Sequence, residues 1–176
     1  MPDRIDYRIL AELQKNARLS NKELAAIVDL APSTCVERVK RLKSEGAIQS
    51  VTAQINPEVY GIGLQALIAV QLQRHSREMV ERFLSHIEQL REVVRVYHLA
   101  GVTDFLIHVA VRDDKHLRNL LLDSFTTREE VSQTETSLIF ECRANHLLPN
   151  YAESEDSPNK VTHRKTGIKK RSGSGG

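Results

Sequence analysis

Residues 20–46 read SNKELAAIVDLAPSTCVERVKRLKSEG. Ser20 and Glu23 stand three residues apart, as the two members of a capping box do at the start of a helix. Pro32 suits the first position of a second helix, because proline lacks the amide hydrogen that is unpaired there. Gly46 suits the position just after that helix, where a left-handed backbone is common. The stretch therefore predicts two short helices joined by a tight turn.

Another helix precedes this pair. Asp3 or Asp6 can cap it, and apolar residues then recur at helical spacing: Ile5, Ile9, Leu13. Three helices with a tight connection between the second and the third are typical of a helix-turn-helix domain, whose last helix enters the DNA major groove.

The third helix of this domain has an apolar side and a polar side. Cys35, Val39 and Leu42 follow at i, i+4 and i+7, so they should face the first two helices. The outward positions then carry polar and basic residues: Ser33, Thr34, Glu37, Arg38, Lys40, Arg41, Lys43. Four cations on a helix can be no more than a solvated face, but the capped helix and tight turn before them favour contact with double-stranded DNA.

Each outward residue type has a partner on DNA. Arg38 or Arg41 can donate two hydrogen bonds to guanine, and Glu37 can accept one from cytosine. Ser33 and Thr34 suit a base or a phosphate, whereas Lys40 and Lys43 are predicted to contact phosphates.

The second half of the chain predicts alternating strands and helices. The alternation of apolar and polar residues indicates a strand at residues 48–55, followed by turn residues up to Gly63. Beyond these, Ser76 can cap one helix and Asp113 or Asp114 another. Strands are predicted at residues 64–73, 93–100, 104–111 and 131–142. The order βαββαβ predicts an α+β, ferredoxin-like domain, in which two helices cover one face of an antiparallel sheet.

Charge is distributed unevenly along the 176 residues. The net charge is +2 over residues 1–56, −6 over residues 57–156 and +6 over residues 157–176. Basic ends on an acidic body are typical of a protein whose polyanion contacts are confined to particular segments. The last segment has few large apolar residues, so we expect a disordered tail. It either adds nonspecific DNA affinity or has no role.

The sequence argues against several other classes of protein. It has neither a long apolar run nor a signal peptide, which predicts a cytoplasmic protein without a membrane partner. Cys35 and Cys142 are far apart, so neither a disulfide framework nor a zinc ribbon is expected. No catalytic, cofactor or metal motif is apparent. His98 and His108, predicted to lie almost opposite each other on adjacent strands, could ligate metal or haem, although such a pair is more often structural.

Five segments occur in a specific order and spacing: residues 5–10 (IDYRIL), 19–25 (LSNKELA), Arg38 to Gly46, Gly101-x-x-Asp104 and residues 134–137 (TETS). On these segments the chain, from about Asp3 to Arg143, resembles the Lrp/AsnC (feast/famine) transcriptional regulators. It departs from the family pattern at Ala31, where relatives usually place a serine that caps the recognition helix.

The resemblance implies that the second half binds a small effector, often an amino acid, between homodimers that associate into an octamer of four dimers. By analogy, the effector contacts are the turn of Gly101, Val102, Thr103 and Asp104 together with Thr134 and Thr136. Glycine lets a ligand approach the backbone, Asp104 can take an ammonium group, and threonine hydroxyls can bond a carboxylate. The alternative is an ordinary hairpin turn followed by a strand.

The sequence thus predicts a winged helix-turn-helix domain at residues 1–46, a strand-bearing linker at 47–63, an effector and oligomerisation domain at 64–145, and a tail at 146–176. As a two-fold dimer it would read a roughly palindromic operator. Two alternatives remain: an architectural protein that wraps DNA, and an enzyme similar to the siroheme decarboxylases, which resemble this family and hold a tetrapyrrole.

Overall fold

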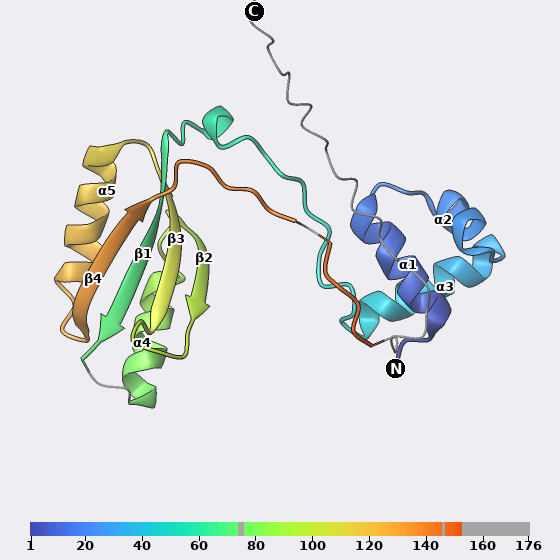
Figure 1. Cartoon of the computed structure of the whole chain (residues 1–176), viewed down its shortest axis with the longest axis horizontal. Helices are drawn as coiled ribbons and strands as arrows, with labels where there is room; N and C mark the ends of the chain where they lie inside the picture. Colours follow the sequence, from blue (N-terminus) through green and yellow to red (C-terminus); the bar gives the residue numbers. More distant parts are fainter. Residues whose placement is uncertain (74–75, 146, 153–176) are drawn as a thin grey trace, which may run out of the picture. The chain divides into compact units, whose positions relative to one another are not determined.

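The computed structural model describes residues 1–73, 76–145 and 147–152, which divide into two units (Figure 1). Residues 1–51 and the segment from Asn145 form the first unit, and residues 52–144 form the second.

The first unit contains the predicted three helices: α1 (Arg4–Lys15), α2 (Asn21–Val28), α3 (Pro32–Ser44). Asp3 caps α1, and Ser20 and Glu23 form the predicted capping box at the start of α2. The expected apolar sides of the helices meet in one core, whose fully buried members are Ile9, Leu24, Ala25, Val28, Cys35 and Leu42. Local capping signals and helical periodicity were therefore sufficient to predict this unit.

The turn before α3 differs from the two capped helix starts. Asp29 ends α2 in the left-handed region, with φ 61°. Ala31 occupies the N-cap position of α3 with an extended backbone (φ −63°, ψ 140°), and its methyl group makes no capping hydrogen bond. At the other end of α3, Gly46 has φ 77°, as its predicted role requires.

Replacing Ala31 with serine is expected to stabilise the first unit by about 1 kcal/mol, because the hydroxyl can accept a hydrogen bond from an amide of the first turn of α3. Urea unfolding of the full chain measures this difference. Ser20→Ala, which removes the existing cap of α2, should have the opposite sign and a similar size. An Ala31→Ser variant no more stable than the parent would contradict this account of the helix start.

The predicted strand at residues 48–55 is wrong for the single chain. No strand lies between α3 and the 3-10 turn Pro57–Tyr60 in the part of the chain that is described. Val51 and Ile55 are 62% and 49% exposed. A strand needs a neighbour for its backbone hydrogen bonds, and the described sheet contains only four later strands. Residues 48–55 therefore have the alternating pattern of a strand, but no strand of the described sheet lies beside them.

The second unit has the predicted βαββαβ order. The sheet order is β2-β3-β1-β4, and all neighbours are antiparallel. Its elements are β1 (Leu64–Leu72), α4 (Arg77–Ile87), β2 (Val93–His98), β3 (Phe105–Val111), α5 (Asp114–Leu121) with the π-helical turn Leu122–Thr126, and β4 (Val131–Leu138).

Each strand of the sheet centre buries alternate residues. Ile68 and Val70 of β1 and Ile107 of β3 pack with Phe83 of α4 and Phe125 after α5. This face is the helix-covered face of the sheet. The opposite, open face carries half-buried side chains, including Leu67, Ala69, Leu106, His108 and Ala110.

The end of the chain differs from its prediction in one respect. β4 stops at Leu138, which pairs with Ala66 of β1, rather than at Cys142. Beyond it, the amide of Leu148 donates to Gln14 Oε1 of α1 at 2.7 Å, within the first unit. The predicted tail falls largely on residues 146 and 153–176, which lie outside the described residues.

Candidate DNA-binding face and effector site

The exposed face of α3 lies opposite its core face. Ser33, Glu37 and Lys40 follow at i, i+4 and i+7, two residues out of step with Cys35, Val39 and Leu42, and two residues turn a helix by about 200°. All three are exposed, as are Thr34 and Lys43. We call Ser33, Thr34, Glu37 and Lys40 the reading face. Of the seven predicted DNA-contacting residues all but Arg38 are therefore exposed, since the side chain of Arg41 is also 45% exposed.

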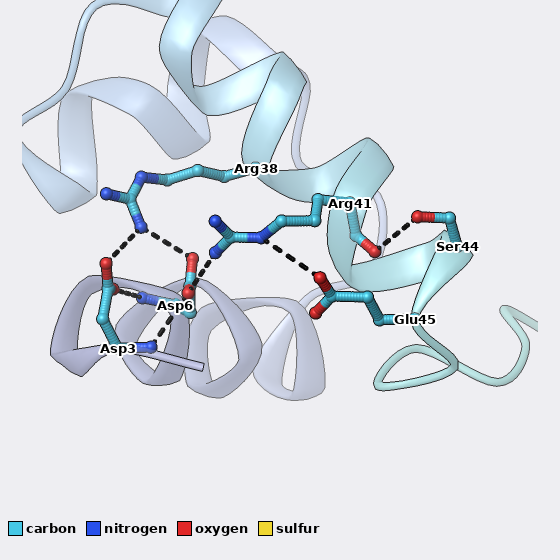
Figure 2. Close-up of polar contacts among 6 residues, drawn as sticks. All are labelled: Asp3, Asp6, Arg38, Arg41, Ser44 and Glu45. Carbon is cyan, nitrogen blue, oxygen red and sulfur yellow. Dashed lines mark hydrogen bonds and ion pairs between the residues drawn. The ribbon is translucent and has the colours of Figure 1, made fainter. Parts of the chain in front are cut away.

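The other two predicted residues, Arg38 and Arg41, turn back towards α1 (Figure 2). Arg38 Nη1 lies 2.6 Å from Asp3 Oδ2 and 2.8 Å from Asp6 Oδ1. Arg41 Nη2 bonds the other oxygen of Asp6, and Arg41 Nε lies 3.9 Å from Glu45 Oε1. The ion pairs with Asp3 and Asp6 join residues more than thirty positions apart in the sequence.

Asp6 is the centre of these contacts and is completely buried. Its amide donates to Asp3 Oδ1, and its own Oδ2 accepts from the amide of Asp3, both at 2.9 Å. The hydrogen bond from Arg38 lowers the pKa of Asp3, and the bonds to Asp3 and Asp6 raise the pKa of Arg38. Sequence reasoning considered both aspartates only as caps. Their spacing at the start of a helix gave no signal of the distant arginines.

The predicted effector turn, residues 101–104, connects β2 to β3. Gly101 has φ 140°, a conformation that favours glycine, and Val102 is 83% exposed. Asp104 is buried, and its Oδ2 accepts from the amide of Leu72 at 2.7 Å. Its own amide donates to Val70 O at 3.0 Å. Asp104 therefore ties the turn to the end of β1.

The predicted threonines lie across β1 from this turn. Thr134 pairs with Val70 and Thr136 with Ile68, so both point to the helix-covered face, where they are half-buried. Val70 also pairs with Phe105, the residue after the turn. The turn and the threonines thus share one end of the sheet. Within one chain they are separated by β1, a spacing of two strand intervals, or about 10 Å.

The predicted opposition of His98 and His108 is wrong. His98 pairs with Phe105 and stacks on its ring with 4.6 Å between centroids, whereas His108 pairs with Arg95. A bulge between Val93 and Arg95 shifts the register. His108 Nε2 lies 2.9 Å from Gln65 Oε1 on the open face, and burial, together with the Arg95 charge, lowers the pKa of His108. The two rings are on opposite faces, so they cannot ligate one ion.

A cavity that the sequence gave no sign of lies at the other end of the sheet. It has a volume of about 430 Å³, and its lining includes Asn56, Glu58, Leu64, Leu138 and Phe140. Among the described residues, no group of three or more His, Cys, Asp or Glu side chains could hold a metal. None of the described helices combines the length and the hydropathy that crossing a membrane requires.

Comparisons with known proteins match both units. The family described as "Lrp/AsnC ligand binding domain" matches residues 65–145, and "Winged helix-turn-helix DNA-binding" matches residues 2–49. The chain is 45% identical to the HTH-type transcriptional regulator AldR of Mycolicibacterium smegmatis over 79% of this chain and 81% of that one. It is 36% identical to the leucine-responsive regulatory protein of Escherichia coli, over 79% and 85%.

Solved structures of transcriptional regulators also match most of the chain. A transcriptional regulator of Neisseria meningitidis, solved in complex with L-Met, has a TM-score of 0.78 and 30% identity, covering 87% of this chain and 100% of that one. Escherichia coli AsnC has a TM-score of 0.72 and 27% identity, covering 84% and 99%.

Proposed function

The chain belongs to the Lrp/AsnC family of DNA-binding transcriptional regulators, and we propose that it reads a roughly palindromic operator as a homodimer under the control of an amino acid. One observation carries the DNA half of this proposal: α3 presents an exposed reading face opposite its core face. Because its partner is chromosomal DNA, the regulator works in the cytoplasm.

The side chains of α3 support a division of roles on DNA. Glu37 lies at the middle of the reading face and accepts from cytosine, while Ser33 and Thr34 at the helix start contact bases or phosphates. Lys40 and Lys43 neutralise phosphates, which fixes the helix on the duplex without reading its sequence.

The open face of the sheet supports the homodimer. Leu67 and Ala69 of β1 and Leu106 and Ala110 of β3 form an apolar strip on it, while α4 and α5 pack on the other side. A two-fold dimer of this kind places two α3 helices in major grooves about 34 Å apart. The octamer of four dimers is proposed on family membership alone.

The effector half of the proposal is an amino acid bound between subunits. A relative of this fold has been solved with L-Met. Since β1 separates the turn from Thr134 and Thr136 within one chain, a ligand between subunits can contact the turn of one chain and the threonines of another. Of the predicted contacts, Asp104 has the weakest support, because it is buried and already bonds Leu72.

Addition of the cognate amino acid should change both the assembly and the DNA affinity, the latter by about 5- to 150-fold, because a ligand shifts an equilibrium only through its unequal affinity for the two states. Light scattering after size exclusion and fluorescence anisotropy, each run against a panel of twenty amino acids, measure the two effects. Thr134→Val should weaken the response to the ligand by about tenfold, the cost of one hydrogen bond, and leave ligand-free DNA binding unchanged. Thr127→Val, on an exposed residue outside the site, is the matched control. If none of the twenty amino acids changes the assembly or the DNA affinity, the proposed sensing function is refuted, whereas the proposed DNA binding is not affected.

A further inference from the structure

We propose that Asp3 and Asp6 are positioning residues for DNA recognition, which hold Arg38 and Arg41 on α1 and so leave base reading to the reading face. These four residues form the α1–α3 ion cluster. The proposal deepens the proposed function and depends on it, because it concerns how the same helix meets DNA.

The contacts of the cluster show where the arginines are held. Both oxygens of the buried Asp6 carboxylate are bound to guanidinium groups, one to Arg38 and one to Arg41 (Figure 2). Asp3 adds a second acceptor for Arg38. If either arginine moved to a guanine, a fully buried carboxylate would lose one of its two guanidinium partners. Breaking a buried ion pair by removing one partner costs more free energy than one base contact returns. The arginines therefore stay on α1 when DNA binds.

The position of the arginines on α3 gives the cluster a geometric role. Arg38 and Arg41 lie one turn apart on a flank that they share with Thr34, between the core face and the face of Ser33, Glu37 and Lys40. Rotation of α3 about its own axis is opposed by the burial of Cys35 and Leu42, and the ion pairs along this flank add a directional restraint to it. The cluster thus keeps Ser33 and Glu37 aimed away from the core.

The cluster also sets the charge that DNA meets. Two aspartates match two arginines, so the remaining cations of α3 are Lys40 and Lys43, which are both exposed. The number of phosphates that α3 neutralises should accordingly depend on the lysines and not on Arg38. This separates a positioning role from a phosphate contact in the salt dependence of binding.

The test compares Asp6→Asn, Arg38→Ala and the double variant of the full chain. Anisotropy is measured on a duplex selected by the parent protein from a random pool and on a scrambled duplex, over a range of salt concentrations. Each single variant should lower the ratio of specific to nonspecific affinity by about tenfold, and Arg38→Ala should do so at an unchanged salt slope. The double variant should lower this ratio no further than either single variant does, because both substitutions break the same contact between Asp6 and Arg38. Asp29→Asn makes the same chemical change on an exposed residue of this unit and should leave the ratio unchanged.

Other outcomes overturn the proposal. A loss of preference at one base pair in Arg38→Ala but not in Asp6→Asn would make Arg38 a base reader. A shallower salt slope in Arg38→Ala, with weaker binding to all duplexes, would make it a phosphate contact. If Asp6→Asn does not fold, Asp3→Asn replaces it in the test, because Asp3 is half-exposed. An unchanged ratio of specific to nonspecific affinity in Asp3→Asn would overturn the proposal as well. A parent protein that prefers no duplex would instead refute the proposed function.

Discussion

Leu106→Glu is expected to turn the proposed dimer into a monomer and to weaken operator binding by about 100-fold or more, because two linked readers gain at least that factor over one. Leu106 lies in the middle of the open face, where it pairs with Ala69 on one side and Tyr97 on the other. A carboxylate there is solvated in a monomer but is buried without a partner in a dimer. The change therefore acts on the pairing of subunits and not on the fold of one subunit.

Light scattering gives the mass of the variant, and anisotropy on the selected duplex gives its DNA affinity. Leu106→Met conserves volume and hydrophobicity and should behave like the parent protein. Circular dichroism should show the same helix and strand content for both variants. A Leu106→Glu protein that remains a dimer would place the subunit interface elsewhere on the molecule.

Glu37→Ala is expected to reduce discrimination at one base pair of the operator by about 10- to 100-fold, the cost of one direct base contact. Glu37 is exposed and lies between Ser33 and Lys40 on the reading face. A carboxylate on this face repels phosphates, so its loss should at the same time strengthen binding to scrambled DNA. The affinity of the Glu37→Ala variant for the operator duplex should therefore fall, while its affinity for the scrambled duplex should rise.

Lys40→Ala is the control for this prediction, because a lost phosphate contact weakens every duplex alike and reduces the salt slope by about one. Anisotropy on a set of duplexes that differ at single base pairs measures both variants. If Glu37→Ala keeps the full preference of the parent at every position, Glu37 does not read bases and the reading face has to be redefined.

Features with local causes were predicted well from the sequence. Ser20 and Glu23 cap α2, and Gly46 ends α3, because capping depends on residues within one turn. The strands of the second unit bury the alternate residues that the pattern indicates, since the period of two is built into the backbone.

Features that depend on distant partners were missed. The predicted strand at residues 48–55 has no place in the described four-stranded sheet, and β4 ends at Leu138 instead of Cys142. The register of His98 and His108 depends on a β-bulge between Val93 and Arg95, which no local residue pattern predicts. Helical periodicity placed Arg38 and Arg41 outside the core, which is correct for their backbone. Their long side chains nevertheless reach back to Asp6, more than thirty residues away in the sequence.

The central claim, that this regulator recognises a DNA sequence through α3, is tested most directly by a salt-dependent anisotropy titration. The parent protein is titrated against the DNA upstream of its own gene and against a scrambled duplex of the same composition. We predict an affinity for the upstream duplex about a thousandfold or more above that for the scrambled one at physiological salt, with both affinities falling as salt rises. Equal affinities for the two duplexes, or binding that is insensitive to salt, would contradict the account.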